Sequence, residues 1–475
     1  MDMRTRARRS APLLQIIALL AIVSVAAEQD WPMWGGTANR NMVSAAGPLP
    51  ASWDVQAKTN IKWKVGLGYT SYGNPVVAGG KIFVGTNNVR PRTAITGDKG
   101  VLMCFRESDG AFLWQAVSDK LESGQDNDWP EQGVCSSPAV EGTRLYYVTN
   151  RGELVCLDTE GFADGRNDGP FQNETHTGPT DADIIWKLDM VKDLGVYPHN
   201  MSNSSPLVWE DLVFVETSNG RDGDHEKVPS PKAPSFLAVN KATGKVVWQD
   251  GSPGEDILHG QWSSPSLAIV DGAAQVIFPG GDGWLYAFNA RTGEKLWWFN
   301  LNPKDAVWPK TKNDAVATPV HHDGKVFMSV GQDPDSGEGI GHMYAIDPGK
   351  RGDITETGRV WQYDKIRRSI STAAVADGLV YNADFSGFLH CVDAATGAPQ
   401  WIYDALAAVW GSPLVADGKV YLGDEDGDVV VLKAGRTLTK LAEINMGNAI
   451  HSTPVAANGA LYIMTSSDLY AIALR

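Results

Sequence analysis

One module of about forty residues recurs eight times and restricts how this chain of 475 residues can fold. Each copy has Ser/Thr-Pro, an apolar run ending in an aromatic residue, a Gly/Asp turn, a run with Leu-Tyr-Ala character, and then Thr-Gly and Trp. The clearest copy extends from Ser264 to Trp297. The landmarks of the eight copies are Pro75, Pro138, Pro206, Pro265, Pro319, Ala373 in place of proline, Pro413 and Pro454.

The runs within each copy have the composition of β-strands. Val213-Phe214-Val215 and Val326-Phe327-Met328 are rich in β-branched and aromatic residues and are too short for helices. Asp282-Gly283, between two apolar runs, predicts a hairpin with a two-residue turn. About forty residues accommodate four such strands, so each copy predicts a four-stranded antiparallel sheet.

A four-stranded sheet with two apolar faces must be covered on both sides, and radial stacking of eight copies achieves this. We therefore predict an all-β fold, an eight-bladed β-propeller over residues 61–475. The last copy stops after Leu469–Ile472 without its Trp strand, and Ile61–Val65 is an unassigned Trp strand near the start. We expect this N-terminal strand to complete the last blade and close the ring.

The first 27 residues have the pattern of a secretory signal peptide. Four arginines precede an uncharged apolar stretch, Ala11–Val25, which ends in small residues. We expect cleavage after Ala27, with retention as an anchor as the alternative, and a lead-in over residues 28–60. The product would be exported to the periplasm or the extracellular space, without a stable membrane span. The net charge of −15 argues against a nucleic-acid partner.

Seven tryptophans occur once per repeat, and we expect them to pack between blades: Trp63, Trp114, Trp186, Trp248, Trp297, Trp361 and Trp401. The repeat Leu-Tyr-Ala-x-Asp-x-x-Thr-Gly-x-x-x-Trp, best matched at Leu285–Trp297 and Leu389–Trp401, resembles the pyrroloquinoline-quinone (PQQ)-type propeller repeat. That family includes quinoprotein alcohol dehydrogenases and the propeller lipoprotein of the barrel-assembly complex. The dehydrogenases carry two adjacent cysteines beside the quinone, and no two of the four cysteines here are adjacent.

One face of the predicted ring gathers the connections between blades and those after each second strand. Polar and aromatic residues outside the repeat pattern fall there, and they are the candidates for ligand binding. The candidates are Trp129, His199, Asn203, His259, Trp262, Arg367, Arg368, Trp410 and His451.

No catalytic residue and no metal site is expected. His199, His259 and His451 have irregular spacing on blades that are not all adjacent, so we expect hydrogen bonds to loop backbone rather than a zinc cluster. A calcium loop at Asp164, Asn167 and Asp168 is the alternative.

These observations favour an exported, non-catalytic scaffold that binds an envelope protein or another extracellular ligand without a cofactor. A dehydrogenase of alcohols or sugars that depends on PQQ and calcium is one alternative. A carbohydrate-binding propeller, suggested by the aromatic candidates, is another.

Overall fold

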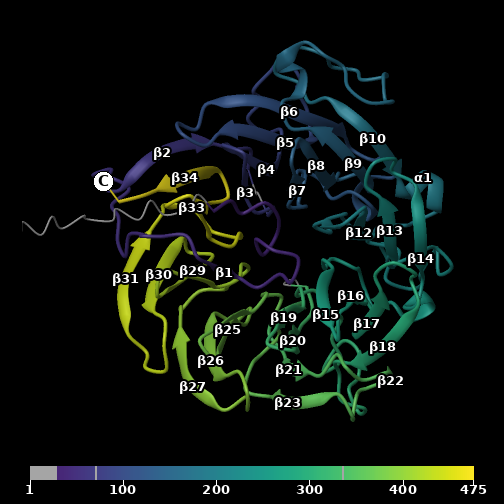
Figure 1. Ribbon diagram of the computed structural model, residues 1–475, viewed down its shortest axis with the longest axis vertical. Coiled ribbons are helices and arrows are strands. Elements are labelled where there is room, and N and C mark those ends of the chain that lie inside the picture. Colours follow the sequence, from purple (N-terminus) through teal and green to yellow (C-terminus); the bar gives the residue numbers. More distant parts are fainter. Residues whose placement is uncertain (1–28, 70–71, 334–335, 475) are drawn as a thin grey trace, which may run out of the picture.

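The computed structural model describes residues 29–69, 72–333 and 336–474, in which eight sheets lie around a central axis (Figure 1). The predicted eight-bladed propeller is confirmed. The named helical elements within these residues are α1 (Met190–Leu194) and the short 3-10 turns η1 (Gly124–Asp126), η2 (Gly161–Asp164) and η3 (Gly254–Asp256). The predicted signal peptide, residues 1–27, lies outside the described residues.

The first four blades follow one another along the chain. Blade 1 contains β3 (Val76–Ala78), β4 (Lys81–Asn87), β5 (Lys99–Arg106) and β6 (Phe112–Asp119). Blade 2 contains β7 (Ala139–Glu141), β8 (Arg144–Val148), β9 (Glu153–Asp158) and β10 (Ile184–Asp189). Blade 3 contains β11 (Leu207–Trp209), β12 (Leu212–Glu216), β13 (Phe236–Asn240) and β14 (Val246–Asp250). Blade 4 contains β15 (Ser266–Val270), β16 (Ala273–Pro279), β17 (Trp284–Asn289) and β18 (Lys295–Asn300), with β22 (Gly352–Asp353) added in parallel.

The remaining blades complete the circle. Blade 5 contains β19 (Val320–His322), β20 (Lys325–Val330), β21 (His342–Ile346) and β23 (Arg359–Tyr363). Blade 6 contains β24 (Ala374–Ala376), β25 (Leu379–Ala383), β26 (Phe388–Asp393) and β27 (Pro399–Asp404). Blade 7 contains β28 (Leu414–Ala416), β29 (Lys419–Gly423), β30 (Asp428–Lys433) and β31 (Lys440–Asn445), with β1 (Val43–Ser44) added in parallel. Blade 8 contains β32 (Val455–Ala457), β33 (Ala460–Met464), β34 (Asp468–Ile472) and β2 (Ile61–Gly66).

Blade 8 joins the two ends of the chain, as the sequence predicts. Strand β2 pairs antiparallel with β34, so that Trp63 lies opposite Ala471 and Lys64 opposite Tyr470. The ammonium of Lys64 also lies 3.3 Å from the Asp468 carboxylate. The first and last segments of the propeller are thus held in one sheet.

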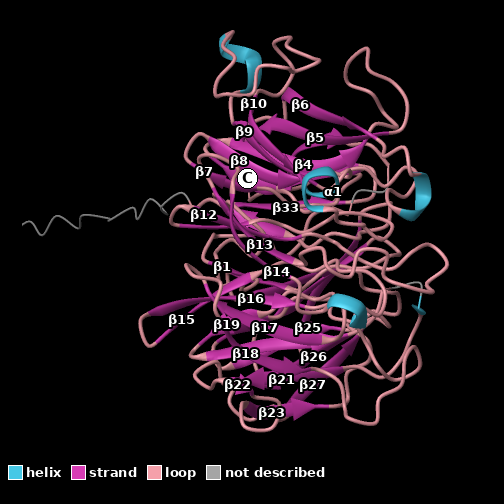
Figure 2. Cartoon of the chain, turned by 90° about the vertical axis from the view of Figure 1, so that its right-hand side faces the viewer, coloured by secondary structure: helices cyan, strands magenta, loops and turns pink. Residues whose placement is uncertain are grey.

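The turns divide the molecule into two faces. Short turns join first to second and third to fourth strands, apart from the insertions 159–183 in blade 2 and 347–358 in blade 5, and we call their side the hairpin face. Asp271-Gly272 is typical, because both residues have positive φ and form the two-residue turn that β-twist favours. The hairpin at Asp282-Gly283 exists, but four residues, Gly280–Gly283, separate its strands instead of the two predicted. The longer connections gather on the opposite side, the loop face (Figure 2).

The Ser/Thr-Pro motif forms a belt of hydrogen bonds around the channel. The residue directly before each landmark residue takes part; in blade 1 it is Asn74. At seven of the eight blade junctions, its backbone N–H donates to the side chain of the residue at the same repeat position in the next blade. The bond from Ser412 to Thr453, at 2.8 Å, is one example. The belt explains why a short hydroxyl residue precedes the proline in most copies.

The repeat tryptophans join adjacent blades near the hairpin face. Six of the seven donate an indole N–H, at 2.9–3.0 Å, to a backbone carbonyl of the next blade. Trp297 instead donates to the Gln275 side chain within its own blade. The interior between blades is apolar, as where Phe236 of blade 3 stacks on Phe278 of blade 4 at 4.7 Å.

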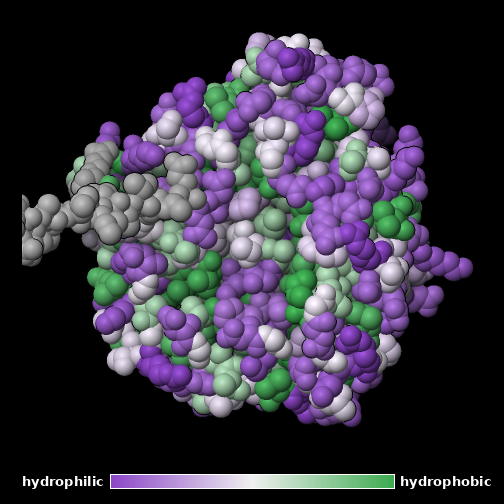
Figure 3. Space-filling view, viewed as in Figure 1, coloured by the Kyte–Doolittle hydropathy of each residue, from purple (hydrophilic) through white to green (hydrophobic). Residues whose placement is uncertain are grey.

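The lead-in circles the channel and contacts every blade in turn. Its backbone or side chains bond to Val77 of blade 1, Val140 of blade 2, Ser205 and Pro206 of blade 3, Leu267 of blade 4, His321 of blade 5, Val375 of blade 6, Val415 of blade 7 and Ala456 of blade 8. The purple segment in the middle of Figure 1 is this lead-in. In Figure 3, which shows the hairpin face, the centre of the ring is filled. The loop face is therefore the side on which the channel end is not covered by the lead-in.

Candidate functional site

Three histidine rings contact one another on the loop face over blades 3 and 4. His199 precedes blade 3, His259 precedes blade 4, and His225 lies between β12 and β13. The ring centroids are 4.4–4.9 Å apart. Among the described residues, this is the one group of three His, Cys, Asp or Glu side chains whose ligand atoms all lie within 4.8 Å of one another.

Hydrogen bonds fix the orientation of two of these rings. His199 is fully buried, and its Nδ1–H donates to the carbonyl oxygen of Arg221 at 2.8 Å. His259 Nδ1 lies 2.7 Å from an Asp333 carboxylate oxygen. Burial, aided by His259, lowers the pKa of His199 to about 4, so this imidazole is neutral at neutral pH. Its Nε2 is buried and has no hydrogen-bond partner in the part of the chain that the structure describes.

Neighbouring groups hold this cluster in place. Trp262 donates its indole N–H to the His199 carbonyl at 3.0 Å, and its ring lies 5.0 Å from that of His259. Burial alone would raise the pKa of Asp333, but the hydrogen bond and charge of His259 outweigh it and lower that pKa. Gly220 allows the close approach, because a Cβ there would lie 2.6 Å from the Cβ of His199.

His451 does not join this cluster. It belongs to a second aromatic group on the loop face, in which its ring lies 5.1 Å from Tyr72 and 5.0 Å from Trp410. Phe385 contacts Trp410 at 5.5 Å. The Trp410 indole nitrogen and His451 Nδ1 are buried and have no hydrogen-bond partner among the described residues. The aromatic candidates are therefore divided between two places on the loop face.

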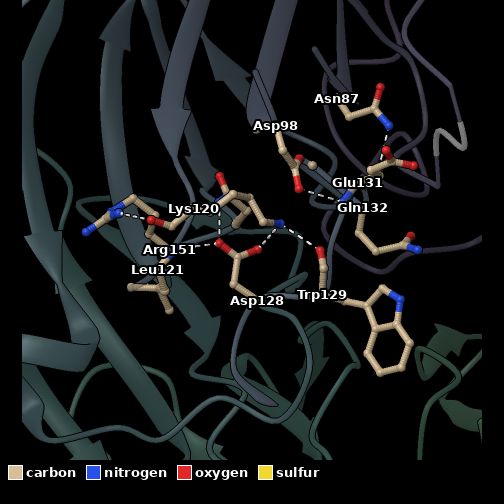
Figure 4. Close-up of polar contacts among 12 residues, drawn as sticks. Asn87, Asp98, Lys120, Leu121, Asp128, Trp129, Glu131, Gln132 and Arg151 are labelled. Atoms are coloured by element: carbon tan, nitrogen blue, oxygen red, sulfur yellow. Dashed lines mark hydrogen bonds and ion pairs between the residues drawn. The ribbon is translucent and has the colours of Figure 1, made fainter. Parts of the chain in front are cut away.

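Trp129 stands on a loop that is held by an ion pair with a buried carboxylate (Figure 4). The Asp128 carboxylate pairs with Lys120, and it also accepts hydrogen bonds from Leu121 N at 2.9 Å and the Asn150 side chain at 2.7 Å. Lys120 in turn donates to the Trp129 carbonyl at 2.7 Å. In Figure 4 the indole ring points away from this network, and Trp129 is 36% exposed. The loop thus presents an aromatic side chain in a fixed position.

The two candidate arginines have different surroundings. Arg367 is exposed and pairs with Glu338. Arg368 is buried, and its guanidinium donates to the Asn313 side chain and to carbonyl oxygens of Ser336, Pro309 and Lys310. Arg368 therefore orders the surrounding loops instead of forming a free cation at the surface. The remaining candidate, Asn203, has a buried Oδ1 without a hydrogen-bond partner among the described residues.

The proposed calcium loop uses its polar groups internally. Asp164 accepts from Arg166 N at 2.9 Å, the Asn167 side chain donates to Glu174 at 2.9 Å, and Asp168 N donates to Asp183 at 2.9 Å. These contacts are those of an ordinary polar turn. A calcium site there stays a prediction.

Three carboxyl groups are buried in blades 3 to 5, at the ends of strands that lead to the loop face. Glu216 ends β12, Asp282 lies between β16 and β17, and Asp314 precedes β19. Burial raises the pKa of all three, to about 6 for Asp282 and well above the ordinary value for Glu216 and Asp314. Neither carboxylate oxygen of Asp314 has a hydrogen-bond partner among the described residues. Burial in this region therefore favours the neutral, protonated form of these carboxyl groups over the negatively charged form.

Sequence reasoning missed one member of the histidine cluster, His225, and the partner of His259, Asp333. Both lie in connections that interrupt the repeat, 218–235 and 331–342, so the repeat register does not mark them. The sequence offered one signal for His225. It lies in the insertion that follows β12 of blade 3, and His199 directly precedes the same blade.

The ring of four-stranded blades, most of which are joined to the next blade by a repeat tryptophan, defines a β-propeller of the PQQ-like repeat class. Residues 177–351 and 341–475 match the profile of the family described as outer membrane protein assembly factor BamB. These matches span more than half of the chain, and the chain belongs to this family.

Solved structures share the fold at low sequence identity. BamB from Moraxella catarrhalis is 15% identical with a TM-score of 0.55, covering 87% of this chain and 96% of that one. A europium-containing methanol dehydrogenase is 12% identical with a TM-score of 0.51, covering 94% of this chain and 98% of that one. The quinohemoprotein alcohol dehydrogenase of Comamonas testosteroni is 12% identical with a TM-score of 0.52, covering 94% and 81%. These likenesses concern the fold alone.

A curated relative matches a shorter region. The tetrathionate hydrolase of Acidianus ambivalens is 25% identical over 173 residues, which are 33% of this chain and 29% of that enzyme. The match therefore covers less than a third of that enzyme. Within the described residues, no helix is long and apolar enough to span a membrane.

Proposed function

We propose that this protein is an exported, non-catalytic propeller that binds a partner protein in the cell envelope through its loop face. The observation that carries the proposal is a set of exposed large apolar side chains on the connections of that face. These residues are Tyr69, Val89, Trp129, Val307, Ile340 and Leu406. Aromatic side chains such as Trp129 and Tyr69 are enriched at protein-binding surfaces relative to the rest of a protein surface.

Trp129 is the expected anchor of this interface. Tryptophan is enriched among the residues that dominate binding energy, because it buries a large area and has few rotatable bonds. The Lys120–Asp128 pair fixes its loop before a partner arrives, which lowers the entropy lost on binding. A rigid propeller that presents a fixed tryptophan suits recognition of another macromolecule.

The family membership supports an envelope role. The matching family is described as an outer membrane assembly factor, and the first 27 residues carry the features of a signal peptide. We therefore place the proposed partner outside the cytoplasm.

Site-specific photo-crosslinking in the native host tests this function. A photoreactive amino acid would replace Trp129 on the loop face or, as the control, Val247, which is 50% exposed on strand β14 of blade 3. We expect one discrete adduct from position 129 and none from position 247. With the photoreactive group at Leu406, W129A should reduce the adduct at least tenfold, corresponding to about 1.4 kcal/mol or more of binding energy. Equal adducts from positions 129 and 247, or no adduct from either, would contradict the proposal.

The proposed function needs no quinone, and two loop-face arginines that could hold PQQ already donate to other groups. PQQ carries three carboxylates and therefore requires free cationic donors. The guanidinium of Arg221 donates to the carbonyl oxygens of Ile257 and His225, and that of Arg368 is likewise committed to loop groups. We expect no dye-linked oxidation of alcohols or sugars after addition of PQQ and calcium. Stoichiometric uptake with turnover would favour the dehydrogenase alternative.

A second candidate function is carbohydrate binding at Tyr72, Trp410 and His451. Aromatic rings stack on sugar faces, and the unpaired Trp410 and His451 nitrogens offer hydrogen bonds to hydroxyl groups. Titration with soluble oligosaccharides should then change tryptophan fluorescence in the native protein and not in W410A. An unchanged signal with all sugars would eliminate this candidate.

A further inference from the structure

We propose that His199, His225 and His259 bind one divalent transition-metal ion of the zinc class on the loop face. This site is independent of the proposed partner binding, and its experiment requires no partner. The three rings come from three separate connections, and they meet through their ring nitrogens instead of each bonding to its own loop. Imidazole nitrogen is a preferred ligand of zinc, copper and nickel.

The hydrogen bonds leave lone pairs directed into the cluster. A carbonyl oxygen only accepts, so the nitrogen of His199 that faces Arg221 O carries the proton, and Nε2 carries the lone pair. The Asp333 carboxylate likewise accepts a hydrogen bond from Nδ1 of His259. The lone pair of His259 is then on Nε2, which faces His225. A carboxylate or backbone carbonyl behind each ligating histidine is the usual outer shell of a protein zinc site.

The distances agree with a tetrahedral ion. Nε2 of His259 and Nε2 of His225 are 3.3 Å apart. Two nitrogens bound at about 2.05 Å stand about 3.3–3.4 Å apart at a tetrahedral angle, and about 2.9 Å apart at a right angle. The widest separation in the cluster is within 4.8 Å, so closure around an ion needs a shift of up to about 1.4 Å. His225 is exposed in the turn at 222–227 and can move toward an ion more freely than the two buried rings.

The unpaired nitrogen of His199 is the second reason to infer an ion. A buried acceptor without a partner is unfavourable, and native proteins seldom keep one without a ligand or ordered water. A metal ion would satisfy this lone pair together with those of the other two rings. Three protein ligands leave a fourth position for water or a small anion, as in zinc sites that are open to solvent.

Zinc titration of the untagged mature protein tests the proposal. After removal of bound metal with a chelator, we expect calorimetry to give one Zn²⁺ per chain. Substitution with Co²⁺ should give the intense visible absorption of a tetrahedral nitrogen-ligated ion. Absence of stoichiometric zinc binding would overturn the proposal and would mean that the His225–His259 contact is an ordinary hydrogen bond.

Two variants and a control assign the ligands. His225→Ala should abolish stoichiometric binding without disturbing the fold, because this side chain is exposed. Asp333→Asn should weaken binding 10- to 100-fold, as removal of an outer-shell carboxylate does. His176→Ala removes an exposed histidine of another loop and should bind zinc like the native protein. Zinc binding unchanged in His225→Ala, or lost in His176→Ala, would contradict the assignment.

Discussion

Arg40 is fully buried although it carries a charge, and it binds the lead-in to the ring. Its guanidinium donates to the carbonyl oxygens of Ser205 and Pro206 in blade 3, Pro265 at the start of blade 4, and Trp34 of the lead-in itself, at 2.7–3.0 Å. Burial lowers the pKa of Arg40 to about 9. The planar fork of the guanidinium is what allows one side chain to satisfy several carbonyls at once.

Arg40→Ala should therefore destabilise the protein by about 3–5 kcal/mol, because it leaves a cavity and unpaired buried carbonyls. Arg40→Lys should recover only part of the loss, since an ammonium cannot reproduce the fork. Urea unfolding followed by tryptophan fluorescence would measure both variants. A loss below about 1 kcal/mol for Arg40→Ala would show that the lead-in is held mainly by its backbone.

Asp282 should make stability depend on pH. Burial raises its pKa to about 6 in the folded protein against 3.8 as the ordinary value, although hydrogen bonds from Tyr286 and the Trp284 backbone, and the charge of Lys312, act in the opposite direction. The folded state therefore holds the proton more tightly, and stability falls as pH rises from about 4 to about 6. The loss amounts to about 3 kcal/mol for a shift of about two units.

Asp282→Asn is the matching measurement for that pH dependence. Between pH 4 and pH 6 the native protein should lose about 3 kcal/mol relative to this variant, and above pH 6 the difference should stay constant. Other raised carboxyls, such as Asp183 and Asp424, are present in both proteins and cancel in the comparison. If the unfolding free energies of the native protein and of Asp282→Asn changed in parallel between pH 4 and pH 6, the pH dependence could not be assigned to Asp282.

Residues that act once in the molecule were the ones that the sequence could not predict. Arg40 is a single arginine in the lead-in, and His225 lies in an insertion, so neither belongs to a pattern that could be checked against other copies. Arg368 was a candidate for ligand binding, yet the chain folds loops around it. His199 and His259 were found because their distance from the proline landmarks places them on the same face.

At the scale of elements, the Thr-Gly turns and the tryptophans of the repeat are complementary. The Trp248 ring of blade 3 lies against Gly293 of blade 4, and its indole N–H donates to Ala290 O at 3.0 Å. A Cβ at Gly293 would lie 2.7 Å from Trp248 Cγ. The same pairing joins Trp63 to Gly110, Trp186 to Gly244, and Trp361 to Gly397. The glycine of this turn is thus required by the neighbouring blade as well as by its own φ.

Gly293→Ala should therefore destabilise more than Gly272→Ala, which is the matched control in the same blade. Both glycines have positive φ, but a Cβ at Gly272 would meet nothing within 4 Å. We expect about 1 kcal/mol for Gly272→Ala from backbone strain alone, and about 2 kcal/mol more for Gly293→Ala from the clash with Trp248. Equal urea midpoints for the two variants would refute this role of the tryptophan.

At the scale of the whole molecule, the blades and the closure of the ring were predictable from the sequence. Each of the repeats separately predicted the same order of strands, so the copies could be checked against one another. The last repeat lacks its Trp strand, and Ile61–Val65 is a Trp strand without a repeat of its own. The pairing of the two was therefore predictable. The circular path of the lead-in was not predictable, since its contacts are mostly backbone hydrogen bonds to strands far away in sequence.

Removal of β2 should disrupt the ring, whereas removal of the lead-in alone should weaken it. A chain that begins at Leu67 leaves the edge of β34 unpaired, and we expect it to associate or aggregate. A chain that begins at Ala51 keeps β2 and should remain monomeric with a lower melting temperature. Size-exclusion chromatography and thermal unfolding distinguish these outcomes, and a stable monomer that begins at Leu67 would show that closure is dispensable.

The shared blade has a consequence for how the protein is made. Strand β2 leaves the ribosome long before its partner β34, about 400 residues later, which at about 5–20 residues per second is a delay of roughly 20 to 80 s. Throughout this interval β2 has no partner strand, because β34 has not yet been made. Until β34 is complete, the ring cannot close, and we expect the nascent polypeptide to keep an unpaired sheet edge that is open to proteases and to wrong pairing.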